Sequence, residues 1–376
     1  MKIIHISTGL GNGGAEGMLY RLSKEHSNNK LIKIHVINLS DNNWYESKLK
    51  KIGVKVHKIY FKKKITDIFL LIKLMRLLIN LKPDVIQTWM YHANLIGGIF
   101  GYIFTNAKIF WNIRHTNVSI RYTKVLTIIT VRILSFLSHF IPDKIIYCSQ
   151  ESKKIHELKF FNKRKSIFIP NGYDNTFFPS LKKRNIFRKK INISKKVFVV
   201  GLAARFHKEK NFKNLINSFK LFSKNKKDVY LYLKGKNVTL KNIYFKNYLS
   251  KISKKNYKLD SSSSNMLDFM NGIDLFVLPS YSESFPNVLA EAMLCETPCL
   301  STNVGSAKDI LNDFKNSIVP VNDSFALSKA IEKKYKIFKN KKKWVFLKKN
   351  SRKKVINRYK IQNIGFRYLK LWKISK

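Results

Sequence analysis

Short apolar runs alternate with longer mixed segments along the first half of the chain. These runs predict strands at residues 2–7, 33–39, 84–88, 108–113 and 144–148. Each run is continuous and short, which is typical of a parallel strand that is covered on both faces. The segments between the runs have helical length, so this half is predicted to form a doubly wound α/β sheet.

A second alternating series follows a lysine-rich connection. The connection, at about residues 179–195, has little apolar periodicity and is predicted to be a linker. Further strands are predicted at residues 197–204, 229–235, 274–280 and 299–303. A chain of 376 residues is too long for one ordinary core and suits two domains. We expect domains over residues 1–178 and 196–348, followed by a helical segment at 349–376.

Two carboxylates lie around a predicted strand-to-helix turn in residues 274–293, DLFVLPSYSESFPNVLAEAM. The strand is closed by Pro279, and the helix is predicted to begin near Pro286. Glu283 then lies in the loop and Glu291 just over one turn inside the helix. Free amides at a helix N-terminus attract phosphate, and here these would belong to Asn287, Val288 and Leu289. The two carboxylates can therefore bind hydroxyls at both ends of one ligand, such as a sugar and a ribose joined by a diphosphate.

This stretch resembles the donor-binding signature of glycosyltransferase family four, whose members are retaining enzymes that use nucleotide sugars. The resemblance implies a GT-B fold, with two Rossmann-like doubly wound domains and an interdomain cleft. It implies that Glu283 orients the transferred sugar and that Glu291 binds the ribose hydroxyls. It also implies donor contacts from Ser284, Phe285, Asn287, Val288 and Leu289. Considered alone, the two glutamates could equally be a solvated loop residue and a surface helix charge; the intervening SFPNVLA favours the site.

Arg205 and Lys210 follow the strand predicted at 197–204, in the stretch AARFHKEKNFKNLINSF. A guanidinium and an ammonium at a strand end can reach one diphosphate from two directions and neutralise it as it leaves. In so basic a chain, an Arg and a Lys alone would be interpreted as surface charges. Their position resembles that of the family's Arg and Lys, which implies catalytic and donor-binding roles. No divalent metal is expected, because these cations and the helix amides carry the diphosphate charge.

A glycine-rich turn, GLGNGGAE, follows the first predicted strand. Gly9, Gly11 and Gly14 satisfy G-x-G-x-x-G, and Asp41 follows the second strand, so an NAD-dependent oxidoreductase is one alternative. The same residues resemble the family's GGAE turn, which implies that Gly13 and Gly14 meet the donor phosphate or the acceptor. The second half contains a donor signature and no dehydrogenase motif, which favours the transferase.

Further candidates come from the resemblance. His115 ends the strand in KIFWNIRHT, and the resemblance implies a catalytic position near the sugar's reactive centre, although a lone histidine is more often structural. His92 is a candidate on the acceptor side. Ile364, Tyr368 and Leu371 have helical spacing, and the resemblance implies that this last helix packs back on the first domain.

Charge raises a second alternative. Seventy-three Lys and Arg against 22 Asp and Glu give a net charge of +51, which attracts nucleic acid, anionic membranes or phosphorylated substrates. The excess can also be largely compositional. The sequence lacks a nucleic-acid recognition module, so no specific nucleic acid is expected as a partner. Three cysteines without disulfide or metal spacing, and an N-terminus unlike a signal peptide, favour the cytoplasm.

Two apolar segments, residues 68–81 and 125–141, are interrupted by basic residues and fall short of the ~18 apolar residues of a spanning helix. They are interpreted as buried helices or as a membrane-contacting face. If they touch the membrane, residues 118–141 with Arg121 and Lys124 are the expected contact.

We therefore predict a hexosyl- or N-acetylhexosaminyltransferase that uses a nucleotide sugar, with UDP as the expected nucleotide. The expected acceptor is a saccharide, lipid-linked, in surface polysaccharide or lipopolysaccharide biosynthesis. The expected location is the cytoplasmic face of the cell membrane, where the protein would be peripheral on an anionic surface.

Overall fold

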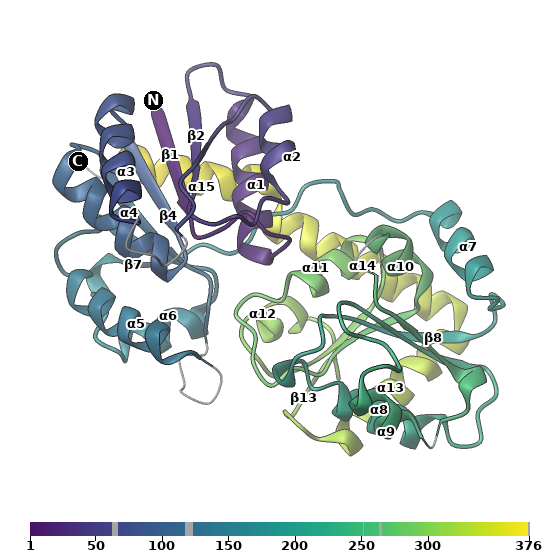
Figure 1. Cartoon of the computed structure of the whole chain (residues 1–376). Coiled ribbons are helices and arrows are strands. Elements are labelled where there is room, and N and C mark those ends of the chain that lie inside the picture. Colours follow the sequence, from purple (N-terminus) through teal and green to yellow (C-terminus); the bar gives the residue numbers. More distant parts are fainter. Residues whose placement is uncertain (62–66, 117–122, 251, 263–264, 375–376) are drawn as a thin grey trace. The chain divides into compact units, whose positions relative to one another are not determined.

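The computed structural model describes residues 1–61, 67–116, 123–250, 252–262 and 265–374. The chain divides into two compact units. The first unit contains Met1–Asp174 and Tyr359–Lys376, and the second contains Asn175–Arg358. Each unit has a parallel sheet with helices around it, so the expected α/β fold is confirmed (Figure 1).

The first unit has a seven-stranded parallel sheet in the order β3-β2-β1-β4-β5-β6-β7. Its strands are β1 (Lys2–Ser7), β2 (Lys33–Asn38), β3 (Lys55–Lys58), β4 (Val85–Trp89), β5 (Lys108–Ile113), β6 (Lys144–Tyr147) and β7 (Ser166–Phe168). The five strands predicted from apolar runs occupy the middle of this sheet. The two edge strands, β3 and β7, were not predicted, because an edge strand has one neighbour and needs fewer apolar residues.

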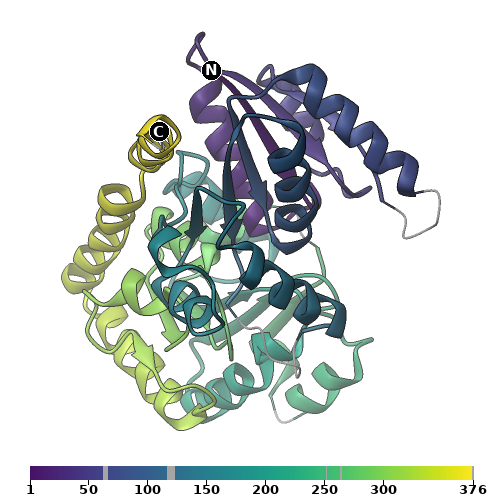
Figure 2. The same cartoon turned by 90° about the vertical axis from the view of Figure 1, so that its left-hand side faces the viewer.

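Helices cover both faces of this sheet (Figures 1 and 2). One face carries α3 (Asp67–Leu81), α4 (Tyr91–Phe104) and α5 (Val125–Leu137), which share one apolar core. The other carries α1 (Gly14–Ser27), α2 (Glu46–Lys51) and α15 (Ile361–Ile374). The remaining helical elements are α6 (Gln150–Glu157) and the 3-10 turn η1 (Lys163–Lys165).

The C-terminal helix α15 lies beside α1 and closes the second core. Tyr368 and Trp372 are fully buried there. The Tyr368 hydroxyl accepts a hydrogen bond from Asn112 at 3.0 Å, and Trp372 Nε1 donates to Gln87 at 3.3 Å. The chain therefore returns to its first sheet after the second unit has ended.

The second unit has a six-stranded parallel sheet in the order β10-β9-β8-β11-β12-β13. Its strands are β8 (Phe198–Ala203), β9 (Val229–Lys234), β10 (Tyr257–Asp260), β11 (Leu275–Leu278), β12 (Cys299–Thr302) and β13 (Ile318–Val319). Its helices are α7 (Leu181–Lys190), α8 (Phe212–Ser223), α9 (Ile243–Leu249), α10 (Met266–Gly272), α11 (Asn287–Leu294), α12 (Ala307–Leu311), α13 (Ser324–Lys339) and α14 (Lys341–Tyr359), with 3-10 turns η2 (Lys208–Lys210) and η3 (Lys254–Asn256). The four predicted strands are again the central ones.

The predicted linker at 179–195 contains helix α7, which belongs to the second unit. Phe187 and Arg188 are buried on it. Arg184 pairs with Asp274 at 2.6 Å, and Arg188 pairs with the other oxygen of the same carboxylate. Because these paired arginines take positions on the covered face of α7, the helix lacks the apolar periodicity by which an amphipathic helix is recognised in a sequence.

Within the described part of the chain, no helix is both long enough and apolar enough to cross a membrane.

Candidate functional site

An ion pair lies at the carboxyl end of the second unit's sheet. Lys210 ends the turn η2 after β8, and Glu283 lies in the loop after β11. The Lys210 Nζ atom is 2.6 Å from Glu283 Oε1, and both side chains are mostly buried. The carboxyl ends of β8 and β11 are neighbours in the sheet, which explains how residues 73 positions apart meet. The structure thus brings together two of the predicted catalytic residues.

Ser280 adds a second hydrogen bond to the same carboxylate oxygen. Its hydroxyl donates to Glu283 Oε1 at 2.8 Å, and its own backbone oxygen accepts from Thr302 at 2.6 Å. The other carboxylate oxygen, Oε2, accepts no hydrogen bond from the residues that the structure describes. That oxygen is therefore oriented by the pair and remains able to bind a ligand hydroxyl.

Gly305 packs closely against the backbone of the loop that contains Glu283. Its φ of +49° favours glycine, and a Cβ there would lie 2.2 Å from the Glu283 backbone oxygen. The next residue, Ser306, donates its N–H to the Ser284 oxygen at 3.0 Å. Gly305 was not predicted as a site residue, although a glycine after strand β12 is a visible signal.

Two other predicted donor residues, Arg205 and Glu291, lie outside the Lys210–Glu283 ion pair. Arg205 follows β8 and is exposed, and its side chain has no ion pair with the described residues. Pro286, predicted near the first helical position, is the N-cap of α11, which begins one residue later at Asn287. Glu291 lies on that helix, half-buried, within its second turn.

One of the three predicted phosphate-binding amides is already used. The N–H of Leu289 donates to the Pro286 oxygen at 3.0 Å, so the prediction of a free amide at Leu289 was wrong. The physical reason is a tight first turn, in which an i+3 hydrogen bond satisfies an otherwise orphan donor.

A second polar cluster lies at the ends of β9 and β10. The buried Lys234 ammonium is 2.6 Å from Asp260, which also accepts from the Tyr232 hydroxyl at 2.9 Å. Burial would raise the pKa of Asp260, but hydrogen bonds from Lys234, Ser262 and Tyr232 outweigh it and lower the pKa to about 2. The sequence analysis missed this cluster, because its members come from two strands.

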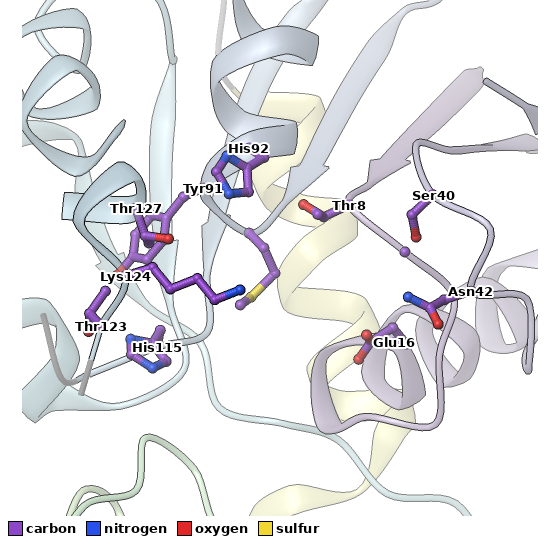
Figure 3. Close-up of a pocket in the computed structure, with 12 residues that line it drawn as sticks. Thr8, Glu16, Ser40, Asn42, Tyr91, His92, His115, Thr123, Lys124 and Thr127 are labelled. Carbon is purple, nitrogen blue, oxygen red and sulfur yellow. The ribbon is translucent and has the colours of Figure 1, made fainter. Parts of the chain in front are cut away.

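The first unit contains a pocket of about 470 Å³ at the carboxyl end of its sheet (Figure 3). Its lining residues are Thr8, Gly9, Glu16, Ser40, Asn42, Met90, Tyr91, His92, His115, Thr123, Lys124 and Thr127. In Figure 3, Glu16, Ser40 and Asn42 lie on one side, and His92, His115 and the extended Lys124 lie on the other. The predicted residues His115 and His92 therefore share one cavity.

Glu16 lies at the turn where Gly13 and Gly14 were expected to meet the donor phosphate or the acceptor. Its carboxylate folds back over the start of α1, and a Cβ on Gly13 would lie 2.3 Å from Glu16 Oε2. Gly13 and Gly14 do not line the pocket, whereas Glu16 does. Burial raises the pKa of Glu16. A phosphate at this turn would meet a carboxylate, so the turn is better suited to hydroxyl groups than to an anion.

A buried histidine fixes one wall of the pocket. The Tyr91 hydroxyl lies 2.7 Å from His156 Nε2, and His156 Nδ1 lies 2.8 Å from the Ser152 oxygen. Burial lowers the pKa of His156 to about 4, so its ring is neutral at pH 7. Because a carbonyl can only accept, Nδ1 carries the proton and Nε2 accepts from Tyr91.

Strain marks the same wall. Met90 has a φ of +73°, which is unusual for a residue with a side chain and costs on the order of 1–3 kcal/mol. It lies in the turn between β4 and α4 and lines the pocket.

Among the described residues, no group of three His, Cys, Asp or Glu side chains is placed to hold a metal ion.

The sequence of this chain is similar to those of known glycosyltransferases. The family model for glycosyl transferases group 1 matches residues 183–362. The chain is 26% identical over 307 residues to the capsular polysaccharide biosynthesis glycosyltransferase CapM of Staphylococcus aureus, covering 80% of this chain and 79% of CapM. It is 25% identical over 225 residues to the UDP-Gal:alpha-D-GlcNAc-diphosphoundecaprenol alpha-1,3-galactosyltransferase of Escherichia coli, covering 58% and 57% of the two chains.

Structural comparison gives the same fold. The crystal structure of Anabaena Alr3699/HepE in complex with UDP matches with a TM-score of 0.83 and 19% identity, over 99% of both chains. Its complex with UDP-glucose matches with a TM-score of 0.82, also at 19% identity and over 99% of both chains. The fold is the GT-B fold, and the sequence matches support a glycosyltransferase over an oxidoreductase or a nucleic-acid-binding protein.

Proposed function

We propose that this protein is a retaining glycosyltransferase that moves a hexosyl or N-acetylhexosaminyl group from a UDP-sugar to a lipid-linked saccharide. The observation that carries the proposal is the carboxylate of Glu283, fixed by Lys210 and Ser280 at the end of strand β11. The names of the capsular and diphosphoundecaprenol-dependent relatives support polysaccharide biosynthesis as the setting.

The donor is assigned to the second unit. Glu283 Oε2 accepts a hydroxyl of the sugar, since Oε1 already accepts from Lys210 and Ser280. Lys210 and the exposed Arg205 bind the diphosphate and stabilise the charge that grows on it as the glycosidic bond breaks. Glu291 binds the ribose hydroxyls. Ser284, Phe285, Asn287 and Val288 complete the donor contacts.

Retention of configuration follows a front-face route in this proposal. A retaining glycosidase uses a carboxylate as a nucleophile. Glu283 is a poor candidate for that role, because an ammonium at 2.6 Å and a hydroxyl at 2.8 Å hold its negative charge. The leaving diphosphate oxygen then accepts the proton of the attacking hydroxyl on the same face of the sugar.

The acceptor is assigned to the pocket of the first unit. Glu16, Ser40 and Asn42 provide acceptors and a hydroxyl for saccharide hydroxyl groups. His115 supports the reacting centre from the opposite wall.

The protein acts on the cytoplasmic face of the membrane, where a lipid-linked acceptor is presented. It needs no divalent metal.

The test uses purified protein with UDP-glucose, UDP-galactose and their N-acetylated forms, and with N-acetylglucosaminyl-diphosphoundecaprenol as the acceptor. Slow UDP release in water and faster release with acceptor are expected, and NMR of the product should show the donor's anomeric configuration. Glu283→Gln should lower both rates at least 100-fold. Glu332→Gln is the matched control, because Glu332 forms a comparable ion pair with Lys226 at 3.1 Å. An inverted product, or a Glu283→Gln protein as active as the control, would contradict the proposal.

A further inference from the structure

Large apolar side chains are exposed on three neighbouring helices of the first unit. Helix α4 lies between α3 and α5, and Figure 2 views the molecule from this side. We name as the α3–α5 face the exposed apolar residues Ile68, Phe69, Ile72, Ile79, Tyr102, Ile103, Val125, Leu126, Ile129, Ile133 and Phe136. Leu126 and Phe136 are 66% and 67% exposed, which leaves most of their apolar surface in water.

These side chains point to one side because the helices form a layer. Leu74 on α3, Gly97 on α4 and Leu134 on α5 all face the same side of the sheet. A Cβ on Gly97 would lie 2.8 Å from Ile6, so α4 is pressed directly against β1. The opposite stripe of each helix therefore points outward. The sequence interpretation of these segments as buried helices holds for one stripe and is wrong for the other.

Basic residues are interspersed with the exposed apolar ones. Lys73, Arg76, Lys124 and Arg132 are exposed on α3 and α5 or at their ends. From residue 67 to 140 the only acidic residues in the sequence are Asp67 and Asp84, and the Asp84 carboxylate accepts from the Lys2 N–H at 2.6 Å. The face thus combines exposed apolar side chains with exposed basic ones.

We propose that the α3–α5 face docks on an anionic lipid bilayer. The apolar side chains enter the boundary between headgroups and acyl chains, and the basic residues contact lipid phosphates, as in monotopic membrane helices. A second copy of the chain fits the face poorly. A twofold interface places the same patch against itself, and this patch would oppose basic residues with basic residues.

Helix α5 connects this face with the pocket. Lys124 and Thr127 line the pocket, while Val125 and Leu126 belong to the exposed face. Residues of one helical turn therefore serve both. This consequence rests on the proposed function: a lipid-linked acceptor anchored in the bilayer would reach the pocket at the first turn of α5. Arg121, which the sequence analysis placed in the contact, lies outside the described residues.

The test measures binding to vesicles of phosphatidylcholine with increasing phosphatidylglycerol. Ile129→Ser with Phe136→Ser should weaken binding at least tenfold, since each change removes exposed apolar area and leaves the buried stripe intact. The matched control is Phe325→Ser with Phe346→Ser, because these residues are 64% and 71% exposed in the second unit. The control should bind like the parent protein. Equal losses in the two double variants would overturn the proposal.

Charge is tested separately from apolar contact. Lys73→Gln, Arg76→Gln and Arg132→Gln together should weaken binding by about fivefold for each basic residue. The control changes three exposed lysines of the second unit to glutamine, namely Lys189, Lys190 and Lys195. If both triple variants lose affinity equally, the net charge of +51 acts as a whole and the proposed face is not the contact.

Two further measurements separate the alternatives. UDP-sugar hydrolysis without vesicles should be unchanged in all these variants, so a failure of membrane docking is distinguishable from a failure of the proposed function. Analytical ultracentrifugation without lipid tests for a second copy of the chain. A dimer that the Ile129→Ser and Phe136→Ser changes convert to a monomer would assign the face to self-association and overturn the bilayer proposal.

Discussion

The carboxyl ends of the two parallel sheets carry sites of different construction. In the second unit, two charged residues neutralise each other within 2.6 Å, and both follow strands in short, recognisable stretches. In the first unit, the pocket is assembled from short segments between Thr8 and Thr127, and its charged groups lie on opposite sides. The site in the second unit is held by an ion pair. The pocket in the first unit is held by packing and by a buried Tyr91–His156 hydrogen bond.

This difference has a physical consequence for ligand binding. A preformed ion pair can exchange partners with a charged ligand without leaving a charge buried alone, which suits a diphosphate. The pocket of the first unit offers mainly neutral hydrogen-bonding groups, with the Glu16 carboxylate, whose pKa is raised, on one side and the Lys124 ammonium on the other, which suits hydroxyl groups. Under the proposed function, the ion pair would serve the donor and the pocket would serve the acceptor.

The largest effect is expected from removing the cation of the pair. Lys210→Met should reduce turnover of UDP-sugar on the order of 100- to 1,000-fold, because a charge stabiliser for the leaving diphosphate is lost and Glu283 is left unpaired. Lys226→Met, which breaks the Lys226–Glu332 pair, is the control. Steady-state UDP release and circular dichroism measure activity and folding. Turnover within threefold of the parent would remove Lys210 from the donor site.

A smaller effect is expected from the backbone that supports the pair. Gly305→Ala should lower turnover on the order of 10- to 100-fold, since the new methyl group would displace the Glu283 backbone by its contact at 2.2 Å. Gly53→Ala separates conformational strain from this contact, because Gly53 also has a positive φ of +78° and nothing within 4 Å. The control should lose about 1–2 kcal/mol of unfolding free energy and keep its activity. Equal activity of the two variants would exclude the supporting role.

The smallest effect is expected at the pocket of the first unit. Glu16→Gln should raise the KM for the diphosphoundecaprenol-linked acceptor about fivefold, since a neutral amide binds hydroxyls less strongly than a carboxylate. UDP-sugar hydrolysis in water should stay unchanged. A parallel loss of hydrolysis would instead place Glu16 at the donor.

The same variant has a pH signature. The raised pKa of Glu16 means that the folded state holds the proton more tightly than the unfolded chain. Its contribution to stability is present below the ordinary carboxyl pKa and is lost as pH rises through the folded pKa. Glu16→Gln should therefore raise the melting temperature at neutral pH, and the gain should shrink as pH falls toward 4.5. Thermal melts over this range test the sign, and a gain that grows in acid would contradict it.

The local pattern of the sequence was enough for the central strands and for the loops that follow them. Glu283 and Lys210 were found because each lies next to a continuous apolar strand, and adjacent parallel strands bring their carboxyl ends together. Edge strands such as β3 and β13 have too few apolar residues to be recognised. Helix α7 was missed because two of its cations, Arg184 and the buried Arg188, pair with Asp274, which is far away in the sequence.

Side-chain directions and packing against neighbouring elements account for the rest. Glycines at residues 13 and 14 predict a turn that meets either the donor phosphate or the acceptor. The carboxylate of Glu16 folds over that turn, and only coordinates show the direction of a side chain. The apolar segments of α3 and α5 predict burial or membrane contact equally well. Which stripe is covered depends on the sheet against which each helix packs. The sequence of one helix does not specify that neighbouring sheet. Strands and candidate site residues were therefore predictable from neighbouring positions in the chain, whereas which of those residues meet and which face water depends on how segments far apart in the chain pack together.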